Sequence, residues 1–427
     1  MIKYSGIVTP FDSSDPMISL SLTLPATTTK IRIWLIGVSF VLFQFFLQLS
    51  SGVVIGTIME ETGLTAFAAG MLGSAFYYVY TTLQIPVGML FDRQSTRLLL
   101  SLSALACSAG CIFFAHSHHL LFLFIGRMLI GAGSAFAFVG LSHLLRQHFP
   151  LKHFAFIIGF SETLGFLVTV VGIISLGALI GQWGWRLFIN WAAVVGVLIS
   201  FLIWRYIPEK KPIDNKFAPP SLQLLLTVLK CSRLWISGLF VGLSFALITV
   251  FAAMWAVPFI QCKLHCTMQT ASLVDAMIFL GAALGCPLFG FLVSHCKKRR
   301  PLMMLSCHIT AILVMITLFA PIHNTWVLGG LMFAIGLCCG AYMLAYSIAN
   351  ELSPKGALST STGFVNTLAM LSAPLLQPVV GFLLDWHAAG QVIYHIIDFQ
   401  WALTIIPLCL FMAGGLVVLL PEKKTLS

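Results

Sequence analysis

The stretch at positions 84–100, QIPVGMLFDRQSTRLLL, places Asp92, Arg93 and Arg97 between two apolar runs. Such crowding is unusual in this chain, because only 8% of its 427 residues are charged and 59% are hydrophobic. A soluble domain carries about 25% charged residues, so the composition excludes that class. The chain is therefore predicted to lie in a lipid bilayer, with this charged cluster in a turn between two membrane-spanning helices.

Apolar segments long enough to cross a bilayer recur on both sides of this turn. A hydrocarbon core about 30 Å thick requires roughly 20 apolar residues of helix, because backbone groups in lipid must be hydrogen-bonded within the segment. We identify twelve such segments between residues 33 and 420. The predicted fold is an all-α membrane protein with twelve transmembrane helices.

The distribution of positive charge predicts how the chain crosses the membrane. The formal net charge is +10, yet every Lys and Arg except Arg127, Arg186 and Lys263 falls in segments on the same side as the N-terminus. By the positive-inside rule, both termini are predicted to be cytosolic, and the expected location is a bacterial inner membrane. No basic groove with interleaved aromatic residues is seen, so nucleic acid is not an expected partner.

The longest hydrophilic internal segment, PEKKPIDNKFAPP at 208–220, has six predicted spans on each side. The first 30 residues show no basic start followed by a small-residue cleavage site, which predicts a cytosolic leader instead of a removed signal peptide. The predicted division is a leader at 1–32, a six-helix bundle at 33–206, a central cytosolic loop at 207–233, a second six-helix bundle at 234–420 and a cytosolic tail at 421–427.

The two halves of the chain carry an internal repeat. GFSETL at 159–164 matches GFVNTL at 363–368 with an offset of 204 residues, which pairs Glu162 with Asn366. In transporters, repeats of this kind form two bundles around one central site. We therefore expect two pseudo-symmetric six-helix bundles.

Three motifs resemble those of one transporter family. GMLFDRQSTR at 88–97 is similar to the loop between helices 2 and 3 of the major facilitator superfamily, whose usual form is G-x-L-x-D-R-x-G-R-R. A degenerate copy, GFLVSHCKKR at 290–299, lies 202 residues later, where the family repeats the motif. GRMLIGAGSAF at 126–136 is similar to the helix-4 motif R-x-x-x-G-x-G. The resemblance implies a secondary transporter that moves a small solute by alternating access, without enzyme activity or a cofactor.

The resemblance also implies a conformational latch at Gly88, Asp92, Arg93 and Arg97. In the family, the Asp of this motif holds the two bundles together, and here its contact is expected at the positive N-terminal end of helix 11 near Ser359. Such a latch would act in the state that is open on the outer side.

The chain departs from the family pattern in three places. Ser95 replaces the Gly that usually follows the Asp-Arg pair, and Ser294 stands in the second copy where Asp92 stands in the first. Helix 5 lacks the G-x-x-x-G-P motif that is common in proton-driven drug exporters. The last difference argues against a multidrug exporter.

Charged residues inside a span cost several kcal/mol in lipid, so each is a functional candidate. Glu162 is either a proton carrier or substrate partner, or a carboxylate satisfied by neighbouring hydroxyls or an ion pair. Arg127 cannot lose its charge, and it either couples to Glu162 or locks helices together. Asp275 either takes part in coupling or occupies a solvated position at the outer mouth. Asn366 is expected to face the same cavity as Glu162.

Polar and aromatic residues at helical spacing identify candidate cavity-lining positions. Hydrogen-bonding groups aligned on one face of an apolar helix point to a wet interior or to a neighbouring helix. Trp255 either lines the cavity or belongs to the aromatic belt at the membrane surface. The candidate lining residues are Gln44, Gln48, Tyr77, Tyr80, Gln84, Tyr342, Tyr346 and Trp255.

Arg127 and Glu162 would offer one positive and one negative anchor to a solute. This pair favours an organic anion, a sugar or a small peptide, carried together with protons by a monomer in the bilayer. Uniport is the alternative mechanism. A drug or siderophore exporter and a non-transporting receptor or scaffold with the same fold are the alternative functions.

Two cysteines, Cys262 and Cys266, lie in a predicted outward loop. A disulfide between them is one interpretation. Their spacing also suits a pair of metal ligands, but no second ligand pair accompanies them, so no metal site is predicted.

Overall fold

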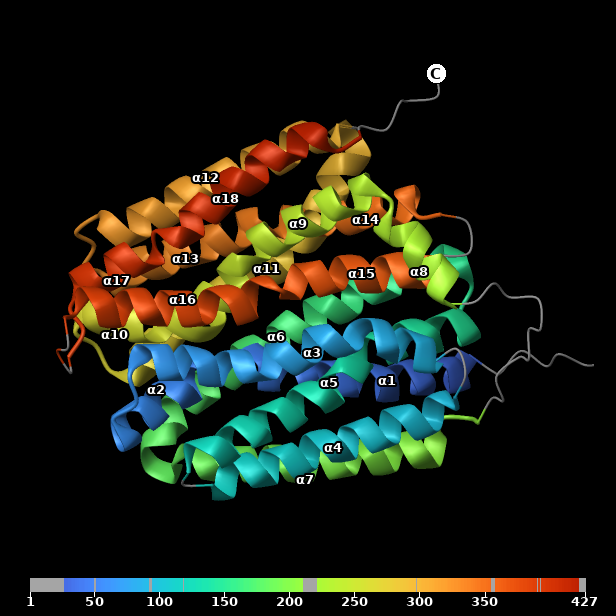
Figure 1. The fold of residues 1–427 in the computed structure, drawn as a ribbon, viewed down its shortest axis with the longest axis horizontal. Coiled ribbons are helices and arrows are strands. Elements are labelled where there is room, and N and C mark those ends of the chain that lie inside the picture. Colours follow the sequence, from blue (N-terminus) through green and yellow to red (C-terminus); the bar gives the residue numbers. More distant parts are fainter. Residues whose placement is uncertain are drawn as a thin grey trace, which may run out of the picture.

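In a computed structural model of the protein, long helices run side by side along one axis (Figure 1). We call the end at which α1 (Thr27–Leu49) begins the terminal end, and the opposite end the distal end. The structure describes residues 27–49, 51–91, 94–117, 119–209, 221–296, 298–354, 358–389, 391 and 393–421. These residues form helices and turns, without a strand.

The first half of the chain contains α1, α2 (Ser51–Thr62), α3 (Ala66–Phe91), α4 (Thr96–His116), α5 (Leu120–His148), α6 (Leu151–Trp183) and α7 (Trp185–Tyr206). A short helix, α8 (Ser221–Leu229), lies in the segment expected as the central loop. The second half contains α9 (Ser232–Ala246), η1 (Leu247–Trp255), α10 (Ala256–Leu264), α11 (Met268–Cys296), α12 (Arg299–Phe319), α13 (Thr325–Cys339), η2 (Gly340–Tyr342), α14 (Met343–Leu352), α15 (Leu358–Met370), α16 (Ser372–His387), α17 (Ile396–Leu403), α18 (Ile405–Leu416) and η3 (Val417–Leu419).

The long helices agree with the twelve predicted spans. Among the described residues, eleven continuous helical stretches are long and apolar enough to cross a membrane. The twelfth long helix is α3, whose 26 residues include no charge but several Tyr, Thr and Gln side chains that lower its mean hydropathy. Two of them, Tyr80 and Gln84, are only 2% and 1% exposed, so they avoid lipid by facing the protein interior. The chain is a multi-pass integral membrane protein.

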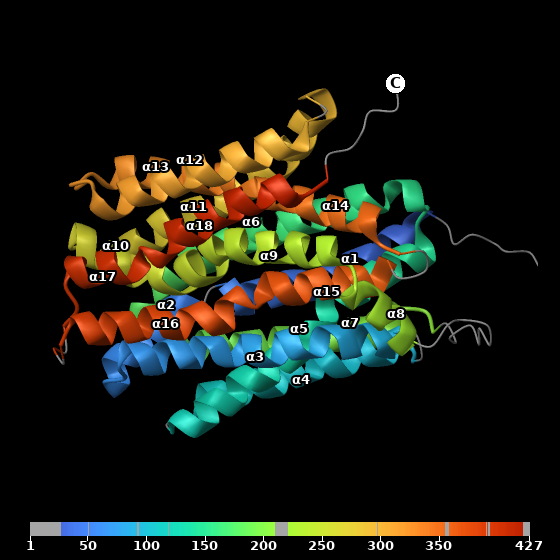
Figure 2. The same cartoon turned by 45° about the horizontal axis from the view of Figure 1, so that its top comes forward.

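Helix contacts sort the spans into two bundles that the internal repeat relates. In the first bundle α5 packs against α3 and α4, and in the second α11 packs against α13 and α12 against α18. Between the bundles, α6 packs against α11, and α3 packs against α15 and α16. Since the repeat relates α6 to α15 and α16, and α3 to α11, these two contacts are equivalent. Figures 1 and 2 show α4 and α12 on opposite flanks of the molecule.

Two equivalent spans approach each other where the bundles meet. The first contains α1 and α2, and the corresponding span of the second half contains the π-helical segment η1 between α9 and α10. Ser51 Oγ donates to the carbonyl oxygen of Ala253 at 3.3 Å. A Cβ atom on Gly52 would lie 2.8 Å from the carbonyl oxygen of Met254, so only glycine permits this approach.

The glycine-rich segments at 126–133 and 281–285 bring neighbouring helices into close contact. A Cβ atom on Gly131 of α5 would lie 2.2 Å from the carbonyl oxygen of Phe76 in α3. In the second bundle, a Cβ atom on Gly281 of α11 would lie 2.2 Å from the carbonyl oxygen of Phe333 in α13. Neither position can hold a side chain, so these glycines allow the close packing of neighbouring helices.

At the distal end, a carboxylate of the second bundle caps a helix of the first. Asp385, near the end of α16, accepts hydrogen bonds from the backbone N–H groups of Ala66 at 3.0 Å and Phe67 at 2.8 Å, where α3 begins. The Tyr394 hydroxyl donates to the same carboxylate at 2.6 Å. Burial and the adjacent Asp385 carboxylate raise the pKa of Tyr394 to about 12, so the hydroxyl keeps its proton. A helix N-terminus has unpaired N–H groups and a partial positive charge, and both favour a carboxylate.

Below this cap the bundles stay in contact along α3 and α16. The Tyr78 hydroxyl donates to the carbonyl oxygen of Pro374 at 3.0 Å, and Ser74 Oγ donates to that of Ala373 at 3.3 Å. A Cβ atom on Gly70 would lie 2.5 Å from the carbonyl oxygen of Gln377. The distal half of the structure is therefore closed.

Removing the distal cap is expected to shift the protein toward a distal-open state. Asp385→Ala eliminates a charged acceptor of three hydrogen bonds, and a loss of about 1–2 kcal/mol at this partly exposed position corresponds to roughly a 5–30-fold population change. The measurement is the rate at which a membrane-impermeant maleimide labels Ser74→Cys in a chain without other cysteines.

The matched control for this experiment is Asp398→Ala. The Asp398 carboxylate accepts hydrogen bonds from His387 and from the backbone of His395, all within the second bundle. This variant should label at the parental rate. Equal labelling of the Asp385 and Asp398 variants would contradict the assigned role of the cap.

Candidate functional site

A cavity of about 220 Å³ lies between the two bundles. Its walls extend from the middle of the molecule toward the terminal end, because Phe91, Arg146 and Asn350 lie close to the terminal ends of α3, α5 and α14. The polar, charged and glycine residues of its lining are Gln44, Gln48, Tyr80, Gln84, Gly88, Ser142, His143, Arg146, Glu162, Tyr342, Tyr346, Asn350, Thr362, Gly363 and Asn366.

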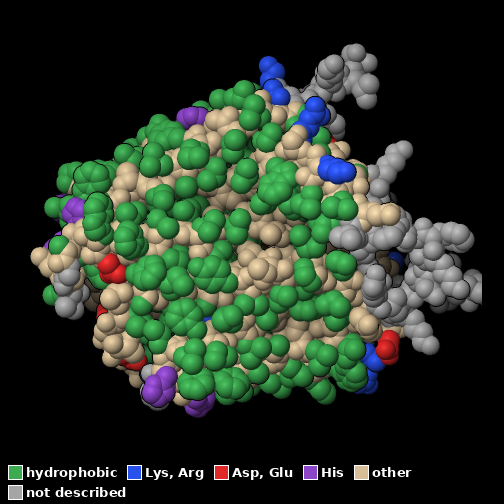
Figure 3. All heavy atoms as spheres, viewed as in Figure 1, with side chains coloured by type: hydrophobic (Ala, Val, Ile, Leu, Met, Phe, Trp, Pro, Cys, Tyr) green, Lys and Arg blue, Asp and Glu red, His purple; other side chains and the backbone are tan. Residues whose placement is uncertain are grey.

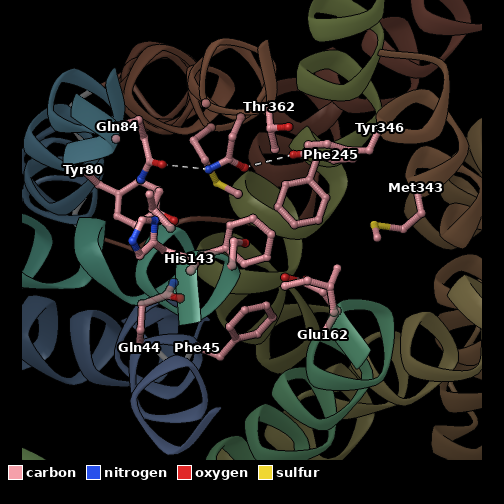
Figure 4. A pocket seen from close by; sticks show the side chains of 18 of the residues that line it. Gln44, Phe45, Tyr80, Gln84, His143, Glu162, Phe245, Met343, Tyr346 and Thr362 are labelled. Carbon is pink, nitrogen blue, oxygen red and sulfur yellow. Dashed lines mark hydrogen bonds between the residues drawn. The ribbon is translucent and has the colours of Figure 1, made fainter. Parts of the chain in front are cut away.

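Glu162 is the acidic residue of this cavity among the described residues. Figure 4 shows its side chain projecting from α6 into the cavity, beside Phe45 and Phe245. The neighbouring hydroxyls do not satisfy it, because Ser161 Oγ donates to the carbonyl oxygen of Ile157 and Thr163 Oγ1 to that of Ala283. No hydrogen bond or ion pair to its carboxylate occurs within the part of the chain that the structure describes.

An amide and hydroxyl network joins the two bundles across the cavity. Asn366 Nδ2 donates to Gln84 Oε1 at 3.2 Å, and the Tyr346 hydroxyl donates to Asn366 Oδ1 at 3.0 Å (Figure 4). On another wall, Gln44 donates to Gln48 through their side-chain amides. Neutral donors and acceptors in this arrangement can exchange their hydrogen bonds for those of a hydroxylated solute.

The basic residues of the cavity are His143 and Arg146 of α5. His143 stacks on the Phe91 ring, with 5.7 Å between ring centroids, and contacts Gln147 at 2.7 Å. In the sequence, Arg146 was assigned only to the positive charges on the side of the N-terminus. His143 was not among the candidate residues. The helical spacing of Phe138, Ser142 and Arg146 could have indicated that this wall continues to the end of α5.

Arg127 lies outside the central cavity, within the first bundle. It is 4% exposed, and its guanidinium donates to the carbonyl oxygens of Leu47 at 3.2 Å and Gly73 at 3.3 Å. The guanidinium also lies 5.3 Å from the centre of the Phe76 ring. None of the ion pairs of the described residues joins Arg127 to Glu162. The ion pair that the sequence analysis considered between these two residues is therefore not formed. The sequence alone did not fix the relative depths of Arg127 and Glu162 in spans 4 and 5. In the folded protein, the two charges are separated.

Three further candidates also lie away from the cavity lining. Asp275 is 1% exposed, so it is not solvated while the distal half is closed. Trp255 is 1% exposed at the end of η1, so it belongs neither to the cavity wall nor to a surface aromatic belt. Tyr77 is fully buried and packs edge-on against Phe76, with ring centroids 5.1 Å apart.

The candidate latch is only partly within the described residues. Asp92 and Arg93 lie outside them, and Gly88 lines the cavity. Arg97 forms an ion pair with Glu209 at 2.6 Å and lies over the Trp204 ring, so its contacts stay within the first bundle.

Cys262 and Cys266 do not form a disulfide in the structure. Cys262 belongs to α10 and not to a loop, and its thiol donates to the carbonyl oxygen of Tyr394. The described residues contain no group of three His, Cys, Asp or Glu side chains placed to hold a metal ion.

Two equivalent helical bundles around a central cavity define a membrane transporter that alternates access to one site. The family model of the Major Facilitator Superfamily matches residues 34–261 and 239–427. The chain belongs to this superfamily, and it is a transporter, not an enzyme.

Relatives and solved structures of this superfamily resemble the chain over most of its length. It is 24% identical to the Bacillus subtilis "Uncharacterized transporter YybO", over 81% of this chain and 85% of that protein. It is 23% identical to the "Probable galactarate/D-glucarate transporter GudP" of Bacillus subtilis, over 77% of this chain and 80% of that protein. The crystal structure of a bacterial homologue of the human lysosomal transporter Spinster, inward-facing and unoccupied, matches with a TM-score of 0.73 at 16% identity, over 92% of this chain and 97% of that one.

The position of Arg127 predicts that it stabilises the first bundle. Arg127→Leu leaves two buried carbonyl groups without these partners and should lower the free energy of unfolding by about 2–4 kcal/mol. The measurement is the melting temperature of the purified protein in detergent without a solute. An unchanged melting temperature, together with loss of a solute-dependent shift, would instead place Arg127 in the binding site.

Proposed function

We propose that the protein is a proton-coupled carrier of a small, hydroxylated organic anion that works by alternating access. The observation that carries this proposal is the carboxylate of Glu162, which lies in the cavity between the bundles without a partner among the described residues. The cavity is the place that both sides of the membrane would reach in turn when the bundles rock.

Proton coupling follows from the surroundings of Glu162. An ionised carboxylate in the middle of a membrane protein requires a counter-charge or water, and Phe45 and Phe245 flank it in the cavity. A proton removes this charge when the cavity closes around the solute. Net coupling requires that the proton be released on the other side and that the empty carrier return with the carboxylate ionised.

The lining supports an organic anion over a drug-sized or strongly basic solute. Arg146 supplies positive charge near the terminal end, and the His143 imidazole, amides and phenols supply hydrogen bonds that match hydroxyl groups. A volume of about 220 Å³ is below the roughly 300–1,000 Å³ of drug-sized sites. The relative named for galactarate and D-glucarate transport is consistent with this solute class. Because Arg127 lies outside the cavity, it cannot pair with Glu162 as the second anchor for a small peptide.

The charge distribution supports an orientation with both termini in the cytosol. Figure 3 shows Lys and Arg side chains gathered near the terminal end, and hydrophobic side chains over the flank between the ends. By the positive-inside rule, the terminal end faces the cytosol. We infer that the bundles at 33–206 and 234–420 are the moving units, and that the distal-closed structure is the inward-facing state of a bacterial inner-membrane carrier.

Glu162→Gln tests the coupling. The amide keeps the size and polarity of the side chain but cannot release a proton, so uphill uptake driven by a pH gradient should be abolished. Counterflow exchange of labelled solute in proteoliposomes should continue at a reduced rate.

The control for this experiment is Glu61→Gln, which alters an exposed carboxylate paired with Arg186 at 2.9 Å. An exposed ion pair contributes little, so both assays should match the parent protein. Equal loss of uphill uptake and counterflow in Glu162→Gln, or loss of neither, would remove Glu162 from the coupling mechanism.

The substrate class is tested by the change in melting temperature with pairs of matched solutes. A six-carbon aldarate should raise the melting temperature of the purified protein, and the sugar alcohol of the same stereochemistry should not. Arg146→Gln should weaken aldarate binding by about tenfold or more, since a charge-assisted hydrogen bond contributes about 1.5–3 kcal/mol. Stabilisation by the sugar alcohol alone would exclude the anion.

A further inference from the structure

Asp275 is a second acidic residue inside the spans, and it lies in the closed distal half. It occupies the second turn of α11 and is 1% exposed. Its Oδ1 atom is buried without a hydrogen-bond partner, and so is Ser272 Oγ one turn away. No ion pair or hydrogen bond to Asp275 occurs in the described part of the chain.

The helical spacing places Asp275 in line with the contact between the bundles. Asp275, Phe279 and Cys286 follow one another at i, i+4 and i+11, which puts them on one face of α11. The Phe279 ring lies 6.4 Å from that of Phe166 in α6 of the other bundle. Cys286 lies beside the cavity-lining Tyr342. Asp275 is therefore about 16 Å further along this face, toward the distal end.

The charged groups on the neighbouring helices have other surroundings. Glu162 of α6 faces the cavity, and Lys263 Nζ of α10 donates to the carbonyl oxygens of Leu318 at 3.3 Å and Ala320 at 2.8 Å. The other described titratable groups on the helices that contact α11 are Glu60 and Glu61 on α2, Cys262 on α10, Arg299, Arg300, Cys307 and His308 on α12, Cys338 and Cys339 on α13, Tyr342 on η2, and Tyr346 and Glu351 on α14. None of these groups forms a hydrogen bond or ion pair with Asp275.

A carboxylate in such a place is costly unless it is neutral. Removing an unpaired charge from water costs several kcal/mol even after relaxation of the protein, and the group avoids this cost by binding a proton. When the bundles separate at the distal end, water reaches α11 and the ionised form becomes favourable. Closure of the distal half therefore binds one proton, and opening releases it.

We propose that Asp275 is a proton-binding site that permits closure of the distal half. The proposal rests on the alternating-access function proposed above, but it assigns Asp275 a role separate from coupling. Glu162 carries the proton that drives transport, whereas Asp275 takes its proton from the distal side and returns it there. The site makes the closing step sensitive to pH on the distal side, independently of any gradient.

The test is counterflow exchange with equal pH on both sides of the membrane, in the Glu162→Gln background. Closure binds one proton, so the distal-closed population should fall by up to about tenfold for each pH unit over which open-state Asp275 is ionised. Exchange should therefore fall as pH rises. Adding Asp275→Asn, which is permanently neutral, should remove this fall and preserve exchange at high pH.

Two comparisons separate this proposal from its alternatives. Asp385 and the His387–Asp398 pair are present at the distal end in both backgrounds, so the test depends only on a difference caused by Asp275→Asn. An unchanged pH dependence in that variant overturns the proposal and leaves the coupling role of Glu162 intact. If the Glu162→Gln protein shows no counterflow, the pH dependence with and without Asp275→Asn is compared in the parent chain. In that case only the proposed coupling role of Glu162 is contradicted.

Infrared spectroscopy provides a second measurement that does not depend on transport. Glu162→Gln protein at neutral pH should show the C=O absorption of a protonated carboxyl, and Asp275→Asn should remove it. Absence of this band in the Glu162→Gln protein overturns the proposal, even if the Asp275 variant does not fold.

Discussion

The close contacts of α3 with α16 and of α6 with α11 hold the two bundles together, and the cavity depends on them. The internal repeat makes these two contacts equivalent to each other. Glycine allows the backbones to approach at Gly70, and the Asp385 carboxylate fixes the start of α3. Because these interactions lie in the distal half, the space between the bundles remains on the terminal side.

Three ionisable groups buried among the membrane-spanning helices have different surroundings. Arg127 cannot lose its proton, and the first bundle supplies it with two carbonyl oxygens and an aromatic face. Glu162 and Asp275 can be neutralised, and neither has a fixed partner among the described residues. In a medium where an unpaired charge is costly, a permanent cation requires permanent partners, whereas a carboxylate can be left to exchange a proton. This difference underlies the separate roles proposed for these residues.

Much of the architecture could be predicted because lipid imposes strong rules on sequence. The twelve spans follow from the length of apolar segments, and the repeat that aligns Glu162 with Asn366 indicates two related bundles. The glycines at 126–133 and 281–285 allow the close helix contacts that are common in membrane bundles. The site was harder to predict, because helical spacing identifies a face but not its depth or neighbour. Tyr77 and Tyr80 are three residues apart on α3, yet only Tyr80 lines the cavity.

The sequence by itself determined the membrane class, the number of spans, the two halves and the presence of Glu162 within a span. These features depend on local hydrophobicity, charge and repetition, which each segment carries independently of its neighbours. Only the tertiary structure decided that Arg127 donates to carbonyl groups inside one bundle, that His143 and Arg146 reach the cavity, and that Asp275 is buried in the distal half. Those outcomes depend on how far each helix is shifted along and rotated about its axis, and both are set by packing between segments far apart in the chain.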